Sequence, residues 1–166
     1  MYCSAISAAN IAGIAKWRAS PSAPASRVRP GDPSSAIGRG FIVDGEEGLA
    51  QTRAGKQVLI PASGARAALC VPVDGDLAAL VGDNRRMLVV ELAEIPEMAR
   101  GRGVILQRYR SGGLADAKVF QLADGLSWRQ GENRTRTEID LTPWRGARGG
   151  AGRGVPQGFP RSGKFG

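Results

Sequence analysis

The sequence contains no histidine, so the side chain that most often serves as a neutral-pH acid–base group or a metal ligand is missing. Cysteine occurs only at Cys3 and Cys70, and this wide separation provides no metal-ligand spacing. Cys70 stands in an apolar stretch and is expected to be a small buried hydrophobic residue. These absences argue against a metal site and against catalysis by histidine.

Long hydrophobic runs are absent as well. No stretch reaches the length of about 18 apolar residues that a membrane-spanning helix requires. The apolar N-terminal segment has no basic region before it, which makes it a poor signal peptide. The sequence therefore predicts no transmembrane segment.

Positive charge is abundant and unevenly placed in a chain whose net charge is +8. Residues 100–166 hold thirteen basic and five acidic side chains, whereas residues 36–99 hold six basic and nine acidic ones. Eleven of those thirteen basic residues are arginine, whose planar guanidinium suits bidentate contact with phosphate. The one-sided excess favours a polyanionic partner, and an ordinary solvated surface is the alternative.

Frequent glycine and proline, 24 and 10 residues, divide the chain into short segments. Residues 1–35 have few large apolar side chains and are expected to form a disordered or unrelated leader, with a short alanine-rich helix over Ser4–Ala15. Residues 36–166 alternate short apolar runs with turn signals. This pattern predicts an all-β domain of propeller-like or sandwich architecture.

The predicted strands are short and separated by glycine-rich or charged turns. A helical turn is expected over Glu94–Met98, and a hairpin turn over Asp83–Arg86. The strands are expected at residues 40–43, 49–52, 57–60, 67–73, 77–81, 87–91, 104–109, 118–122, 126–129 and 134–139.

The most informative stretch, Gly82–Val104, joins a basic turn, a strand, an acidic connector and a Gly-Arg-Gly turn. A weaker copy follows over Gly131–Val155, at the spacing of about 50 residues that is typical of blade repeats. When the two copies are aligned with each other, Trp144 falls at the position of Ile95. Both Trp144 and Trp128 are expected to pack in the core.

The alignment also matches two identical tetrapeptides, Gly-Arg-Gly-Val from Gly101 and from Gly152. Repeats of this kind stack into blades whose loops share one rim. The predicted turns Thr52–Lys56, Gly82–Arg86 and Gly131–Arg134 each carry a basic residue. Such turns would place positive charge along one rim, where it can follow a phosphate backbone without reading bases.

Arginines two residues apart are expected to project from the same strand face, since side chains alternate along a strand. The pairs are Arg100 with Arg102, Arg108 with Arg110, and Arg134 with Arg136. The candidate DNA-binding residues are Arg53, Lys56, Arg85, Arg86, Arg100, Arg102, Arg108, Arg110, Lys118, Arg134, Arg136, Arg148 and Arg153.

Several motifs, in order, resemble the C-terminal domain of the A subunit of bacterial DNA topoisomerase IV, a type IIA topoisomerase, in its alphaproteobacterial form. They are Thr52–Leu59, Gly82–Val104, Asp124–Trp128 and Gly158–Gly166. The resemblance begins near Ile37 and does not include the leader. It implies a β-pinwheel, a propeller-like ring of four-stranded blades. At about 50 residues per blade, residues 36–166 allow two to three blades, so the ring is expected to be incomplete.

The resemblance implies a DNA-binding C-terminal portion that binds and bends duplex DNA for ATP-dependent strand passage, and so serves decatenation, supercoil relaxation and chromosome segregation. The implied partners are double-stranded DNA, the topoisomerase IV B subunit and the rest of the A subunit in a heterotetramer. ATP and Mg would belong to the partner subunit, and no cofactor is expected in this chain. The implied location is cytoplasmic, at the nucleoid or peripheral to the inner membrane.

The whole enzyme implied by the resemblance is an ATP-hydrolysing isomerase, but this chain alone is expected to be non-catalytic. Type IIA enzymes attack DNA with a tyrosine that follows arginine and precedes threonine. Tyr109 follows Arg108 but lacks the rest of that motif, and it is expected to pack in a strand or lie on the rim. The carboxylates Glu91, Glu94 and Glu97 are expected to form a solvated acidic edge.

Two other interpretations stay open at this level. The arginine- and glycine-rich segment Arg145–Arg153 is compatible with an RNA-binding protein. The chain is also compatible with a non-functional, decayed fragment, because an incomplete ring leaves strand edges and blade faces bare.

Overall fold

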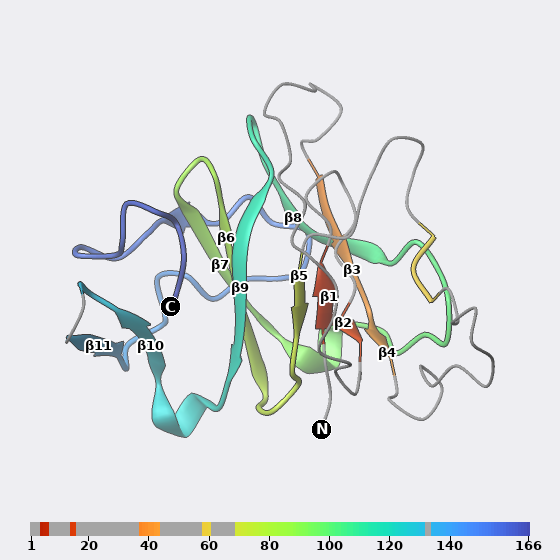
Figure 1. The fold of residues 1–166 in the computed structure, drawn as a ribbon, viewed down its shortest axis with the longest axis horizontal. Coiled ribbons are helices and arrows are strands. Elements are labelled where there is room, and N and C mark those ends of the chain that lie inside the picture. The colour runs from red at the N-terminus through yellow and green to blue at the C-terminus, as the bar shows by residue number, and fades with distance from the viewer. Residues whose placement is uncertain (1–3, 7–13, 16–36, 44–57, 61–68, 132–133) are drawn as a thin grey trace.

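The computed structural model describes residues 4–6, 14–15, 37–43, 58–60, 69–131 and 134–166. Within these residues the regular structure is β, with two short 3-10 turns and no α-helix. Figure 1 shows several small sheets arranged side by side around the long strand β9, and this confirms the predicted all-β class.

The largest sheet contains four antiparallel strands in the order β12–β7–β6–β9. Strands β6 (Leu77–Gly82) and β7 (Arg86–Glu91) form the predicted hairpin. Strand β9 (Leu114–Phe120) pairs with the free side of β6, and β12 (Arg153–Gly154) pairs with the free side of β7. The sheet is therefore assembled from parts of the chain that are far apart in sequence.

Strand β6 is buried along its whole length because both faces of the sheet are covered. Ala78 and Leu80 pack in one hydrophobic cluster, which we call the first core. Leu77, Ala79 and Val81 pack in another, the second core. Successive side chains of a strand point to opposite faces, so an uninterrupted apolar strand is what a two-sided core requires.

The remaining strands form two-stranded sheets, and two 3-10 turns follow β7 and β9. The pairs are β1 (Ser4–Ile6) with β5 (Leu69–Val71), β2 (Ile14–Ala15) with β4 (Ile42–Val43), β3 (Ile37–Gly40) with β8 (Val104–Arg108), and β10 (Leu126–Arg129) with β11 (Thr135–Glu138). The 3-10 turns are η2 (Leu92–Glu94) and η3 (Leu122–Asp124).

A backbone pattern that occurs twice confirms the predicted repeat. The backbone N–H and carbonyl of Ile42 form two hydrogen bonds with the segment 96–98, and those of Val89 form the corresponding two with the segment 144–146. The offset of about 48 residues lies in the range of blade repeats. In each case the connector therefore returns to an earlier strand, β4 or β7.

The predicted correspondence of Trp144 with Ile95 holds for the turn but not for the strand contact, where the carbonyl of Trp144 accepts the N–H of Val89 as the carbonyl of Pro96 accepts the N–H of Ile42. The N–H of Ile95 donates to the carbonyl of Leu92 at 2.9 Å, and the N–H of Trp144 donates to the carbonyl of Leu141 at 2.9 Å. Ile95 is buried in the first core, whereas Trp144 is half-buried and packs against the second core. Trp128 is buried in the second core, as predicted.

The predicted match between the two Gly-Arg-Gly turns is wrong in register. Val104 pairs with Gly40 of β3, and Arg153 pairs with Met87 of β7. Gly40 and Met87 lie two residues before the equivalent residues Ile42 and Val89, so Val104 and Arg153 are equivalent. Gly103, rather than Gly101, is then the counterpart of Gly152, and the φ angles of this pair are 71° and 72°. A backbone conformation that favours glycine, more than the identical tetrapeptide, defines the repeated position.

Three local predictions are corrected. The described parts of Ser4–Ala15 are strands β1 and β2 rather than a helix, because pairing with β5 and β4 overrides a weak helix propensity. The helical turn lies at η2, not at Glu94–Met98, because Pro96 disfavours a helical conformation at Ile95, whose φ and ψ are −96° and 115°. Cys70 is exposed and disulfide-bonded rather than buried.

Other predictions fall outside the described residues or differ only in extent. The strand expected at 49–52, its flanking turns and Trp17 lie outside the described residues. Strand β9 begins at Leu114, four residues before the predicted start, and β5 covers only 69–71. The boundary drawn between residues 35 and 36 stays a prediction.

Candidate nucleic-acid interface

The turn between β6 and β7 presents two arginines in a defined geometry. Arg85 has a φ of 56°, a left-handed conformation that is uncommon for any residue other than glycine. Its N–H donates to the carbonyl of Gly82 at 2.9 Å, and the N–H of Arg86 donates to Asn84 Oδ1 at 3.1 Å. These bonds close the turn, so Arg85 and Arg86 leave the sheet at set positions.

Two distant segments are hydrogen-bonded to this turn. The N–H of Asp83 donates to the carbonyl of Gly113 at 2.9 Å, and the carboxylate of Asp83 accepts the N–H of Gly113 at 2.9 Å. The Arg85 guanidinium donates to the carbonyls of Pro160 and Phe159 at 3.0 and 3.3 Å. The turn therefore gathers the β8–β9 loop and the C-terminal segment around it.

Strand β12 adds a further segment through its pairing with β7. The arginines carried by these four segments form what we call the basic rim: Arg85, Arg86, Arg110, Arg153 and Arg161. All five side chains are exposed. A cluster of exposed arginines from separate segments is suited to contact successive phosphates of a nucleic-acid backbone.

The arginines of the rim divide into two kinds. The guanidinium of Arg85 is bonded to the C-terminal segment, and that of Arg86 donates to the carbonyl of Gly152 at 3.0 Å. The side chains of Arg110, Arg153 and Arg161 form no hydrogen bond or ion pair with the part of the chain that the structure describes. The first kind joins segments together, and the second kind has all its donors available to a ligand.

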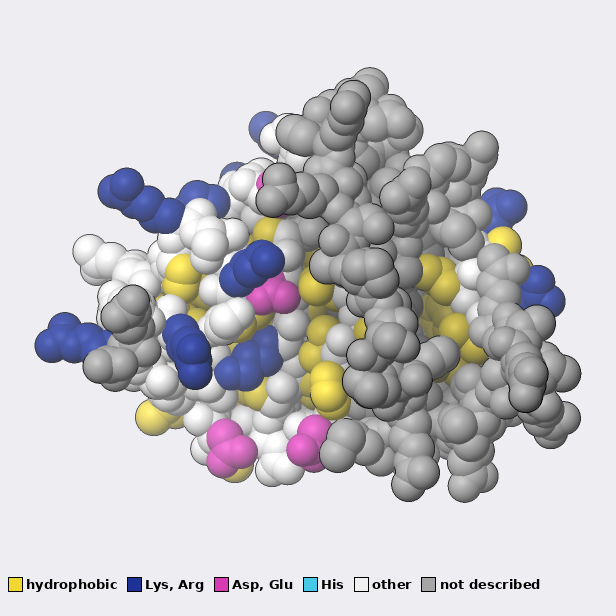
Figure 2. Space-filling model, in the orientation of Figure 1, with side chains coloured by type: hydrophobic (Ala, Val, Ile, Leu, Met, Phe, Trp, Pro, Cys, Tyr) yellow, Lys and Arg dark blue, Asp and Glu magenta, His cyan; other side chains and the backbone are white. Residues whose placement is uncertain are grey.

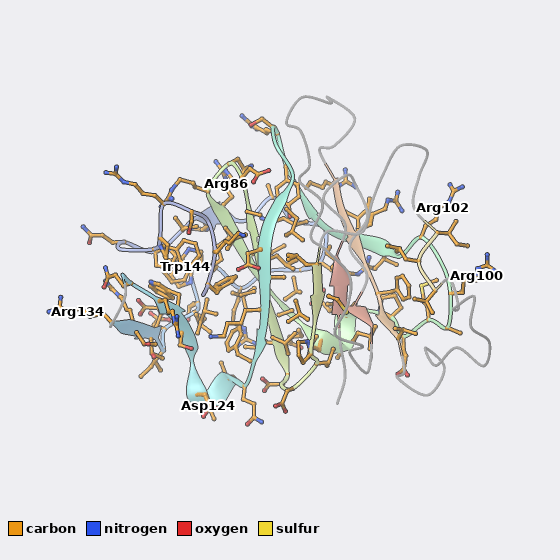
Figure 3. All side chains as sticks on the ribbon, viewed as in Figure 1. Arg86, Arg100, Arg102, Asp124, Arg134 and Trp144 are labelled. Atoms are coloured by element: carbon orange, nitrogen blue, oxygen red, sulfur yellow. The ribbon has the colours of Figure 1, made fainter. Side chains whose placement is uncertain are left out.

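Other predicted DNA-binding residues lie away from this rim. Figure 3 shows Arg100 and Arg102 at one end of the longest axis and Arg134 at the other end, with Arg86 in the half that contains Arg134. On the face seen in Figure 2, basic side chains likewise stand out near both ends. The candidate arginines therefore do not form a single patch.

Strand alternation does not set the direction of the three predicted arginine pairs. Arg100 and Arg102 flank Gly101, which lies outside the named strands and forms an isolated parallel bridge with Leu59. In the other pairs one member lies outside the strand, since Arg110 follows the end of β8 and Arg134 precedes β11. The pairs do not lie within single strands, and the prediction that the members of each pair project together stays a prediction.

Arg136 and Lys118 have intramolecular partners. The Arg136 guanidinium lies 3.6 Å from a carboxylate oxygen of Glu138 and 5.9 Å from the centre of the Trp128 ring. Lys118 Nζ donates to the carbonyl and hydroxyl oxygens of Ser127 at 2.6 and 2.7 Å. Burial lowers the pKa of Lys118, while the nearby Asp116 opposes that shift. This geometry supports a role for Lys118 in joining β9 to β10.

The acidic connector does more than form a solvated edge. Glu91 accepts a hydrogen bond from the Arg145 guanidinium at 2.8 Å, and Glu94 accepts one from the backbone N–H of Arg148 at 2.7 Å. The Arg148 guanidinium also donates to the carbonyl of Ile105 at 3.2 Å. The two carboxylates thus hold the arginine- and glycine-rich segment against the sheet, although each exposed pair contributes only about 0–1 kcal/mol.

Tyr109 is a packing residue in this structure, which agrees with its predicted role. Its side chain is buried, and its hydroxyl donates to Gln107 Oε1 at 3.2 Å. Burial, and then the charge of Asp83, raise the pKa of Tyr109 far above its usual range. A Cβ atom at Gly82 would lie 2.5 Å from the Tyr109 ring, so the ring occupies the space beside this turn.

The Tyr109 pKa predicts loss of stability at alkaline pH. Above pH about 10 the unfolded chain loses the phenol proton while the folded chain keeps it, so the free energy of unfolding falls as pH rises. We expect the loss to approach 1.4 kcal/mol per pH unit. Urea unfolding between pH 8 and 11.5 measures it, and Y109F is the control because it removes the titrating group. A slope equal to that of Y109F would contradict the prediction.

Sequence reasoning missed Arg39 and Arg161. The Arg39 guanidinium donates to the carbonyl of Gly103 at 3.4 Å, which repeats the bond between Arg86 and Gly152. The repeat, aligned in its structural register, would have found Arg39. Arg161 has no such signal, because only the folding of the C-terminal segment onto Arg85 brings it to the rim.

The remaining predictions concern two basic residues, metal binding and membrane spans. Arg53 and Lys56 lie outside the described residues. Across the described ranges, no group of three or more Cys, Asp or Glu side chains is arranged to hold a metal ion. Among those same residues no helix is long and apolar enough to cross a membrane.

Comparison with known proteins relates the chain to one kind of topoisomerase subunit, although no protein-family model matches it. The chain is 43% identical over 132 residues to the A subunit of DNA topoisomerase 4 from Rickettsia prowazekii, and 44% identical over 132 residues to that from Caulobacter vibrioides. Each alignment covers 80% of this chain but only 18% and 17% of the respective relative. The chain thus spans less than a fifth of the length of these curated relatives.

The fold has a counterpart among solved structures. The C-terminal domain of Escherichia coli ParC superposes with a TM-score of 0.60 at 17% sequence identity, and the match covers 96% of this chain and 78% of that domain. This likeness confirms the predicted β-pinwheel architecture. The matched 132 residues therefore belong to the family of DNA topoisomerase 4 A subunits, and their fold is that of its C-terminal β-pinwheel domain.

Proposed function

We propose that this chain is the DNA-binding C-terminal portion of a DNA topoisomerase IV A subunit, which binds and bends duplex DNA for ATP-dependent strand passage. The observation that carries the proposal is the basic rim, where exposed arginines from four separate segments meet around the β6–β7 turn. Arginines of this kind bind phosphate and carry no base specificity. Binding should therefore be independent of sequence.

The proposal extends to the arginines outside the rim. Arg100 and Arg102 lie at the end of the molecule opposite Arg134. A duplex that contacts both ends must run along the longest axis or curve around the molecule. Bending is compatible with this arrangement, since the extra phosphate contacts at the ends offset the cost of deforming the duplex.

The wider assembly is part of the same proposal. Its partners are the topoisomerase IV B subunit and the rest of the A subunit in a heterotetramer, with ATP and Mg held by the partner subunit. Its place is the cytoplasm, at the nucleoid. This chain alone is proposed to be non-catalytic, and the burial of Tyr109 supports that view because a buried, protonated phenol is a poor nucleophile.

The structure does not favour the two alternatives. Arg145 and Arg148 are bonded to β7, η2 and β8, so the arginine- and glycine-rich segment is folded against the sheets. The second core includes Phe159 and Phe165. The C-terminal segment is therefore part of a hydrophobic core and not a bare face.

Salt dependence of binding tests the proposed function. For about five phosphate contacts, the logarithm of the association constant should fall with the logarithm of salt concentration at a slope of about −4.5. Affinity for a 30-base-pair duplex should then fall several hundredfold between about 50 and 200 mM salt. Fluorescence anisotropy with two unrelated duplexes and a single-stranded RNA measures this. Salt-insensitive binding, or a strong preference for the RNA, would count against the proposal.

A further inference from the structure

Gln107 is a polar side chain with no exposed surface, and it lies beneath the basic rim. Its Nε2 atom donates to the carbonyls of Arg86 and Ala151, both at 3.3 Å. Its Oε1 atom accepts the hydroxyl of Tyr109 at 3.2 Å. Both N–H groups of the amide and its oxygen therefore have partners, as a buried amide requires.

The preceding repeat shows that this position does not need a polar side chain for folding. Leu59 is the counterpart of Gln107. The two neighbours of Leu59 in the chain form backbone hydrogen bonds with Gly101, and the two neighbours of Gln107 form the corresponding bonds with Gly149 and Gly150. Leu59 is 8% exposed and packs with Phe41 and Val43. The blade can thus be built over an apolar residue, so the amide at position 107 has a more specific purpose.

The two carbonyls that the amide binds belong to strand β7 and to the segment that leads into β12. One is the carbonyl of Arg86 itself, and the other is the carbonyl of Ala151, two residues before Arg153. The bond from Arg86 to Gly152, which lies over the amide, is 3.0 Å long, whereas the equivalent bond from Arg39 to Gly103 is 3.4 Å long. The closer contact occurs where the amide supports the backbone.

We propose that Gln107, oriented by Tyr109, is a positioning residue that holds the backbone of Arg86 against the segment before β12, and so sets where the Arg86 guanidinium meets a phosphate of a DNA backbone. This inference rests on the proposed function. Because one amide bonds the carbonyls of Arg86 and Ala151, a change at position 107 should shift Arg86 while leaving its charge in place. Buried polar groups of this kind favour one geometry over others that are similarly packed.

The variant Q107L tests the proposal, since it introduces the residue that the chain itself uses at the equivalent position. We expect duplex affinity at 100 mM salt to fall about fivefold, and the salt slope to become shallower by about 1, as one phosphate contact is lost. Y109F keeps the amide but removes the hydroxyl that orients it, so its effect should be in the same direction and smaller.

Leu92→Ala is the matched control, because it removes a buried apolar side chain from the first core and leaves all arginines unchanged. Its salt slope should equal that of the unchanged chain at temperatures where it is folded. If Q107L does not fold, as judged by backbone NMR, Y109F decides the matter. An unchanged affinity and slope in the folded variant would overturn the proposal. Failure of the unchanged chain to bind DNA would instead refute the proposed function.

Discussion

Replacing Arg110, Arg153 and Arg161 together with alanine is expected to weaken duplex DNA binding by two to three orders of magnitude at about 100 mM salt. These are the exposed rim arginines whose guanidinium groups bind no other described residue. Each lost phosphate contact removes the favourable release of its counterions, so the salt slope should also fall by about 0.9 per contact. Fluorescence anisotropy across a salt series measures both quantities.

A charge-matched triple variant separates contact from net charge. Arg136, Arg145 and Arg148 carry the same total charge, but their guanidinium groups are held by Glu138, Glu91 and the carbonyl of Ile105. Replacing these three with alanine should weaken binding far less, by roughly tenfold or below, because only the long-range field changes. Equal losses in the two triple variants would show that the rim has no special role.

The path of the duplex can be examined with a third variant. Arg100, Arg102 and Arg134 lie at the two ends of the longest axis. If a duplex reaches both ends, replacing these residues should weaken binding to a 30-base-pair duplex more than binding to a 12-base-pair duplex. A similar loss for both lengths would indicate that only the rim is in contact.

Replacing Trp128 with alanine is expected to lower the free energy of unfolding by about 3–5 kcal/mol. Trp128 is 1% exposed, and its ring packs edge-on against Phe159 with centroids 5.5 Å apart. Its indole N–H also donates to the carbonyl of Gly158 at 3.4 Å. Such a loss is a large part of the 5–15 kcal/mol that is usual for a domain. Urea unfolding followed by circular dichroism measures it.

Trp144 provides the matched control for this experiment. It is half-buried at the margin of the second core, and its indole N–H donates to the carbonyl of Gly154 at 2.7 Å. Because less apolar surface leaves water here, Trp144→Ala should cost clearly less than Trp128→Ala. The reverse order would mean that the second core is not where the stability of this half of the chain resides.

Local sequence signals predicted the hairpins correctly. The alternation of apolar runs with turn residues located β6, β7 and β10, and the spacing of about 50 residues between similar stretches exposed the repeat. Turn chemistry and strand alternation act over a few residues, so a short window of sequence contains the information.

The pairing of distant strands was beyond these signals. No local sequence pattern indicates the strand order β12–β7–β6–β9 or the hydrogen bond from Arg85 to Pro160. The reason is that nearly every residue type can form the backbone hydrogen bonds that pair strands. The Gly-Arg-Gly repeat illustrates the difference. Identical letters suggested one register, whereas the positive φ of Gly103 and Gly152 marks another.

The sequence by itself determined that this protein is a basic, all-β chain of repeated hairpins with arginines concentrated towards its C-terminal part. Composition, charge and repeat period are properties of the sequence, and they do not depend on how the strands are arranged in space. Only the tertiary structure decided which arginines share a surface, because long-range pairing brought Arg110, Arg153 and Arg161 around one turn. The same folding buried Gln107 against this turn, where its amide bonds the carbonyls of Arg86 and Ala151 and accepts the hydroxyl of Tyr109.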